Sequence, residues 1–141
     1  DENELTGYAL DVLLRKGPFE AKAEWVAYDY QRNASDPPDA IRGQSGLWVE
    51  GAWHFMPCAL RSCRSCLVHD TSLFTLVARW QTMDLDDRVT GATFEDDLEA
   101  LTLGLNYRIT ERTVIRVDHT WYDAEDGDDT TEWTLSVSTY F

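Results

Sequence analysis

The feature that most constrains the fold is an alternation of apolar and polar residues with a period of two. In the stretch LEALTLGLNYRIT (98–110), Leu101, Leu103 and Leu105 alternate with small or polar residues. Successive side chains of a β-strand point to opposite faces of the sheet, whereas a helical face repeats about every 3.6 residues. The pattern therefore predicts a sheet with one apolar and one polar face.

The same alternation recurs along the whole chain of 141 residues, which has the length of a single domain. The expected strands are 6–17, 19–32, 43–55, 72–82, 98–110, 113–123 and 132–141. Short gaps between several of them favour antiparallel hairpins. The fold class that we predict is all-β, an antiparallel up-and-down meander of about seven strands forming one domain over 1–141.

Links and charge divide the predicted sheet into two ends. Successive links of a meander alternate between the ends, so the three long polar links, after the second, fourth and sixth strands, fall together. The net charge is −14, with 26 acidic against 12 basic residues, and most of it lies in 84–99 and 123–132 at this end. An acidic chain is a poor partner for nucleic acid phosphates, so no nucleic acid is expected.

Strands of about ten residues with one apolar face are typical of a transmembrane β-barrel. Aromatic residues suited to interfacial girdles are Trp25, Trp53, Trp80, Tyr107, Trp121, Trp133 and Phe141. The alternation equally fits a soluble β-barrel with its apolar face inward, which binds an apolar ligand. In that alternative, Trp25, Trp53, Leu103 and Leu105 line the pocket. The asymmetric links, a polar face that suits a wet lumen and the final Phe141 favour the membrane type.

Three stretches, in order, resemble the last strands of phosphate-selective porin O/P-type outer-membrane proteins. They are SLFTLVARWQTMDLDD (72–87), LEALTLGLNYRITERTVIRVDHTWYD (98–123) and WTLSVSTYF (133–141). The stretches GYALDVLLRKGPFEAKAEWVAYDY (7–30) and GLWVEGAWHF (46–55) resemble the hairpin and strand that precede them in that family. The resemblance covers most of the chain apart from the cysteine-bearing link.

The resemblance implies a porin of the bacterial outer membrane, through which small, phosphate-like anionic solutes diffuse passively. It also implies contact with outer-membrane lipid, a homo-trimer, and Phe141 as an assembly signal for the barrel insertion machinery. No cofactor is expected. Porins have about 16–18 strands, so seven strands predict a C-terminal segment of a larger barrel or a truncated homologue of one.

Candidate pore-lining residues lie on the polar faces of the predicted strands. They are Arg15, Arg79, Arg108 and Arg116, with Asn106 and Asp118. A guanidinium group can bind phosphate or carboxylate in a bidentate manner, which predicts a wall that guides anions. The alternative is ordinary lumen polarity, in which the arginines pair with Asp118, Glu24 or Asp11.

The third hypothesis is a small metal-binding protein organised by the link CALRSCRSC. Cys58, Cys63, Cys66 and His69 would provide four ligands for a tetrahedral zinc ion. A local insertion, a reading-frame scar or one fortuitous disulfide is the favoured explanation of the cluster, and no metal is expected. The three histidines are isolated and no Ser-His-Asp or phosphate-loop motif occurs, so the sequence does not predict an enzyme.

Overall fold

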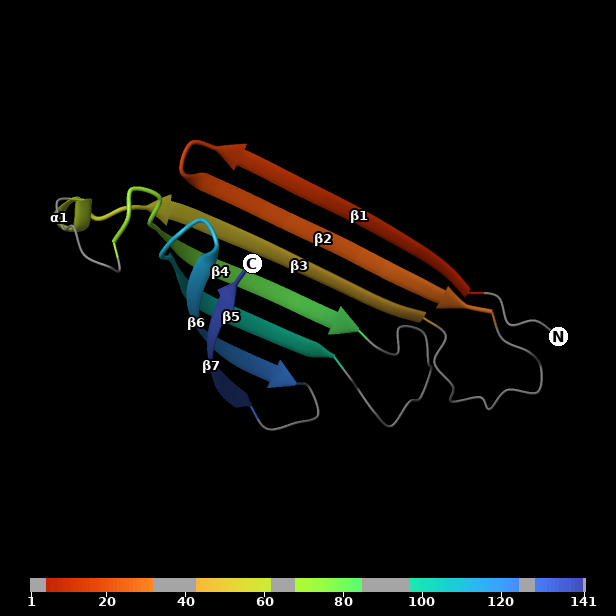
Figure 1. Ribbon diagram of the computed structural model, residues 1–141. Helices are drawn as coiled ribbons and strands as arrows, with labels where there is room; N and C mark the ends of the chain where they lie inside the picture. Colours follow the sequence, from red (N-terminus) through yellow and green to blue (C-terminus); the bar gives the residue numbers. More distant parts are fainter. Residues whose placement is uncertain (1–4, 32–42, 62–67, 85–96, 125–128, 141) are drawn as a thin grey trace.

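The computed structural model describes residues 5–31, 43–61, 68–84, 97–124 and 129–140. In these ranges the chain forms one seven-stranded antiparallel sheet, whose strands follow one another in sequence order (Figure 1). The strands are β1 (Leu5–Lys16), β2 (Phe19–Tyr30), β3 (Gly43–Phe55), β4 (Leu73–Asp84), β5 (Leu98–Arg108), β6 (Thr113–Ala124) and β7 (Thr130–Thr139). The predicted all-β, up-and-down meander is confirmed.

The one helix among the described residues, α1 (Cys58–Arg61), was not expected from the sequence. It is a single turn after Pro57, whose carbonyl accepts a hydrogen bond from the Leu60 amide at 3.0 Å. Four residues are too few for a helical period to be visible in a sequence. No helix in the described ranges has the length and apolar character needed to cross a membrane.

The register of the strands gathers the predicted apolar residues on one face of the sheet. One row across all seven strands contains Leu14, Ala21, Gly51, Ala78, Leu103, His119 and Trp133. The next row contains Phe19, Trp53, Leu76, Leu105, Val117 and Leu135. Since a slip of one residue would turn a strand's side chains to the opposite face, the apolar pattern and the register agree throughout.

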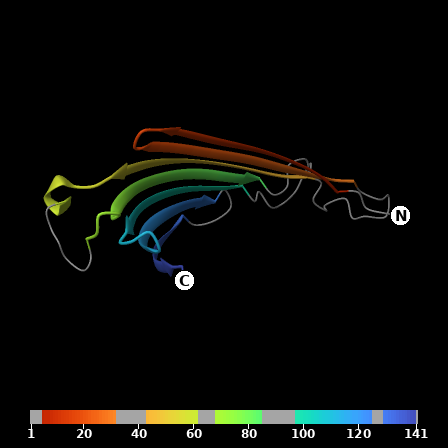
Figure 2. The same ribbon diagram turned by 45° about the horizontal axis from the view of Figure 1, so that its top comes forward.

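The sheet is arched (Figure 2). Its polar face is the less exposed of the two and carries a hollow over β4 to β7, so it is the inner face. Val77 and Ala100 are the only buried hydrophobic residues of the described chain, and both belong to the polar face, as does the buried Asp118. The apolar face is exposed instead, with Leu103 46% and Leu135 72% accessible. The apolar surface of the sheet is therefore not covered by any of the described residues.

Strands β1 and β7 form the two edges, and each pairs with one described strand only. The two edges do not contact each other. With seven strands alternating in direction, β1 and β7 run the same way. An antiparallel closure between them therefore requires an odd number of further strands.

The turn between β1 and β2 depends on Gly17, which has a φ of 59°. We expect Gly17→Ala to destabilise the sheet by about 1 kcal/mol, because the left-handed conformation costs an L-residue roughly that amount. No atom lies within 4 Å of a Cβ built at this position, so the cost is conformational and not steric. Asparagine tolerates positive φ better than alanine does, so the urea midpoint of Gly17→Asn in detergent should lie between those of Gly17→Ala and the parent chain. Equal midpoints for all three would contradict this account of the turn.

Candidate functional site

The polar face carries a hollow of about 300 Å³ over strands β4 to β7. It brings together three of the predicted pore-lining residues, Arg79, Arg116 and Asp118. The rest of the lining is uncharged and rich in hydroxyl groups: Gln81, Thr102, Thr120, Tyr122, Thr134 and Ser136. The Thr102 and Thr120 hydroxyls are 2.9 Å apart and hydrogen-bonded to each other. The hollow is thus a polar, open depression in the wall.

Asp118 is the buried charge of this hollow, with only 8% of its side chain exposed. Its Oδ2 accepts a hydrogen bond from Nε of Arg116, two residues earlier on β6. Asp118 is directly opposite Gly104 on β5, and a Cβ at Gly104 would collide with the Asp118 Oδ1. Because Gly104 has no side chain, it leaves a notch in the surface of the sheet, and the Asp118 carboxylate occupies this notch. We call this arrangement the Gly104 notch.

Glu20 organises a second charged group on the polar faces of β1 to β3. Its carboxylate accepts from Arg15 Nε at 2.5 Å and from Lys22 Nζ at 2.7 Å, and Lys22 also contacts Glu50 at 3.5 Å. The partners expected from the sequence for the arginines of the polar face, Asp118, Glu24 or Asp11, did not include Glu20. The two-residue turn at Gly17 and Pro18 places residue 15 opposite residue 20, and this spacing was the signal that would have identified Glu20.

Arg79 is held by an aromatic ring. Its guanidinium lies 4.5 Å from the centroid of Trp48, and the indole Nε1 of Trp48 donates to Glu24 Oε2 at 2.9 Å. The Arg79 Nε and the Asn106 Oδ1 are buried and have no hydrogen-bond partner among the described residues. Arg108 is exposed at the end of β5, and neither it nor Asn106 lines the hollow. The structure thus groups the predicted pore-lining residues only in part.

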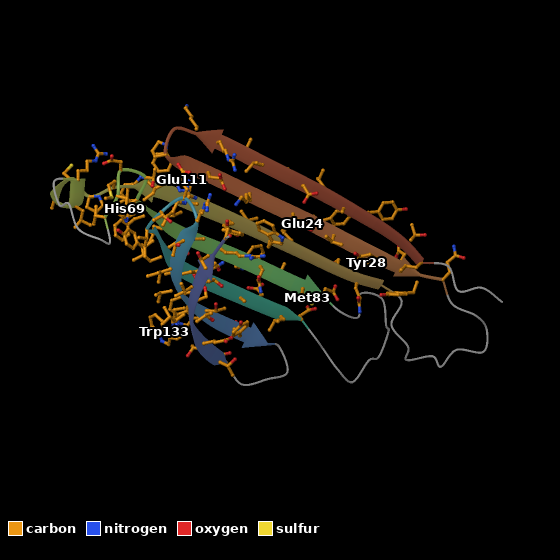
Figure 3. All side chains as sticks on the ribbon, viewed as in Figure 1. Glu24, Tyr28, His69, Met83, Glu111 and Trp133 are labelled. Atoms are coloured by element: carbon orange, nitrogen blue, oxygen red, sulfur yellow. The ribbon has the colours of Figure 1, made fainter. Side chains whose placement is uncertain are left out.

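We expect Glu20→Gln to lower the free energy of unfolding by about 1 kcal/mol or less. The substitution weakens the contacts with Arg15 and Lys22, and the loss is small because Arg15 is two-thirds exposed and screened by solvent. The effect should shrink as salt is raised, because salt screens partly exposed charges. Glu111→Gln is the matched control, because Glu111 is exposed in the turn between β5 and β6 (Figure 3). Urea midpoints in detergent at low and high salt measure both. A loss for Glu20→Gln that does not depend on salt would count against the ion pairs as its cause.

The apolar face carries a row of aromatic rings near the end of the sheet where the short β1–β2 and β5–β6 turns lie. Neighbouring rings are 4.3–6.5 Å apart between centroids along the series Phe19, Trp53, Phe55, Phe74 and Tyr107. Further along this face, the His119 ring lies between Trp121 and Trp133, at 4.1 and 4.3 Å. Figure 3 shows Trp133 on the edge strand β7. All the predicted girdle residues except Phe141, which lies outside the described ranges, belong to this face.

The apolar band crosses the strands at an angle. The band extends from Tyr8 to Leu14 in β1 and from Trp133 to Val137 in β7. In the register of the sheet Trp133 is level with Leu14, so the band begins in β7 at the level where it ends in β1. The band therefore drifts by about four to six residues, or about 13–20 Å, across six strand spacings of about 4.8 Å each. This corresponds to strands inclined by roughly 25–35° to the normal of the band, close to the tilt of about 35–45° of strands in barrels.

The cysteine cluster is described only in part. Cys58 is an exposed free thiol in α1, while Cys63 and Cys66 lie outside the described residues. The His69 amide donates a hydrogen bond to Ser72 Oγ at 2.8 Å, and that hydroxyl donates to the Ile109 carbonyl at 2.7 Å, which fastens this link to the β5–β6 turn. Within the described residues no group of three or more His, Cys, Asp or Glu side chains could hold a metal ion.

No family model, curated protein or solved structure matches this chain. The function is therefore argued from the arrangement of the two faces of the sheet.

Proposed function

We propose that the chain is part of the wall of an outer-membrane β-barrel pore, of the phosphate-selective porin O/P type that its sequence resembles. Small polar solutes diffuse passively along its polar face. The observation that carries this proposal is the difference in exposure between the two faces of the sheet. The less exposed polar face, with its hollow over β4 to β7, is on the inside, and the apolar face, with exposed side chains such as Leu103 and Trp133, is on the outside.

Lipid is the environment that suits the exposed face. Apolar surface in water is unfavourable by about 25 cal/mol per Å², and neither a helix nor a second sheet covers it among the described residues. Strands of 10–13 residues exceed the roughly 9–11 residues that span a bilayer core when tilted. The inclination of the apolar band and the aromatic row at one end support the same environment.

Closure of the pore needs further strands. In lipid, the backbone groups along the outer edges of β1 and β7 must find partners, because no water is present to satisfy them. Since the two edges run in the same direction, we expect an odd number of additional strands to close the barrel in the usual antiparallel manner. Other copies of the same sheet in the same membrane orientation would instead meet β7 to β1 as parallel strands.

The soluble alternative needs the opposite curvature. Trp25, Trp53, Leu103 and Leu105 were the residues expected to line its inner apolar pocket. In the structure all four are on the outer face and 41–46% exposed. The structure therefore does not gather them into a pocket, and none of its features favours this second function.

Solute permeation tests the proposed function. The full chain is refolded with lipid, at a protein concentration that lets copies of the sheet pair through the edges of β1 and β7, into vesicles that contain a small polar solute and a large labelled dextran. We expect the small solute to leave while the dextran stays. A chain that is folded in the bilayer and releases neither would contradict the proposal.

A further inference from the structure

We propose that this pore wall passes small cations in preference to anions, and that Asp118 is a specificity-determining residue because it neutralises Arg116. The inference rests on the proposed function and names the class of solute. The arginines of the polar face on their own favour anions, which is also what the resemblance implies. The contacts that they make in the structure change that balance.

Most bases of the polar face are engaged by carboxylates. Arg116 is bound by Asp118 in the Gly104 notch, and Glu20 binds both Arg15 and Lys22. A base that is neutralised by an adjacent carboxylate offers an anion in the lumen little net attraction. Such wall charges act through their sum, as rings of charged side chains do in selective pores.

The remaining charges of the polar face are mostly acidic. Asp11 and Glu24 are directly opposite each other on β1 and β2, and Glu132 occupies the same face of β7. None of the three forms an ion pair with another described residue. Against them, Arg108 is exposed at the short-turn end and has no ion pair with a described carboxylate.

Arg79 is the base of the hollow that has no carboxylate contact in the described part of the chain. Its guanidinium is instead placed over Trp48, whose indole binds Glu24, and Glu50 faces it across the β3–β4 pair. Its charge is therefore flanked by acids on the β3 side. Arg79 reduces the preference for cations without reversing it.

The long-link end of the sheet adds further negative charge. The described residues at the long-link end include Asp97, Glu99, Asp123 and Asp129, and no Lys or Arg lies among the described residues that border them there. With 26 acidic against 12 basic residues, the whole chain has the same sign. A negative mouth raises the local concentration of cations and favours their entry.

The sign of the reversal potential in a KCl gradient tests the inference on the full chain in a planar bilayer. We expect the reversal potential of the parent chain to have the sign that a pore preferring K⁺ over Cl⁻ gives. Asp118→Asn should shift the potential toward the anion side, because it frees Arg116, and Arg116→Gln should shift it toward the cation side. Glu111→Gln, in an exposed turn, should leave it unchanged.

The opposing shifts keep the test decisive even if one of the two variants fails to fold. An anion-preferring parent chain, or a folded Asp118→Asn or Arg116→Gln variant with an unshifted potential, would overturn the inference while leaving the pore itself intact. A chain that folds in the bilayer but conducts no ions would overturn the proposed function, and the inference with it.

Discussion

Replacing Leu103 with arginine is expected to lower the stability of the chain folded in lipid by about 2–4 kcal/mol. Leu103 lies in the middle of the apolar band, where its side chain is 46% exposed on the outer face. An arginine at the bilayer midplane costs about 2–4 kcal/mol on the lipid face of a barrel. That is a large fraction of a typical stability of about 5–15 kcal/mol.

Thr102→Arg is the matched control, since Thr102 is adjacent on β5 and faces the polar hollow. We expect Thr102→Arg to lower the free energy of unfolding by about 1 kcal/mol or less, mainly because the hydrogen bond to Thr120 is lost. The measurement is the urea midpoint of the folded fraction in vesicles, taken from the gel band that shifts on boiling. If the two variants fold equally well, the assignment of the outer face to lipid is wrong.

The second large effect is expected for Gly104→Ala. The new methyl group would occupy the Gly104 notch, so Asp118 must leave it and the ion pair with Arg116 must break or move. We expect a loss of about 2 kcal/mol, within the range for overpacking of a well-packed site. The measurement is the urea midpoint in detergent.

Two further variants identify the cause. Gly51→Ala is the control, because Gly51 is in the middle of β3 and no atom lies within 4 Å of its Cβ position. It should be close to neutral. Asp118→Ala removes the carboxylate, so the double variant with Gly104→Ala should lose less than the sum of the two single variants, which a double-mutant cycle measures. If the losses are additive, or if Gly51→Ala loses as much stability as Gly104→Ala, the collision with Asp118 is not the cause of the loss.

The strands could be predicted from the sequence because each one presents a full face of alternating residues. In β5, the leucines from Leu101 to Leu105 mark one face, so the strand and the side chains that share its outer surface follow from the period alone. The curvature could not be predicted in this way. An alternating sheet has the same sequence pattern whether its apolar face is inside or outside, and only the structure shows that the apolar face is the more exposed one.

The side-chain partners were harder to predict, because they depend on register between strands. Asp118 was expected as a partner of an arginine, but the need for glycine at position 104 appears only when β5 and β6 are aligned. Likewise, the placement of Arg79 over Trp48 joins two strands that are separated by a long link. Local alternation specifies which face a residue occupies, and contacts across the sheet specify which neighbour it meets.

The six tryptophans offer the most direct test of the account. Five of them, Trp25, Trp53, Trp80, Trp121 and Trp133, are on the outer apolar face, and Trp48 alone is on the inner polar face. Two variants of the full chain, each with the other five tryptophans replaced by phenylalanine, keep only Trp80 or only Trp48. Their fluorescence is measured in vesicles with bromine-labelled acyl chains and, separately, with aqueous acrylamide.

We expect brominated lipid to quench Trp80 strongly and Trp48 weakly, and acrylamide to quench Trp48 more strongly than Trp80. The contradicting result is a folded chain in plain buffer whose Trp80 is shielded from acrylamide and, after lipid is added, from brominated chains as well. The apolar face would then be turned inward, and the chain would not be the wall of a membrane pore.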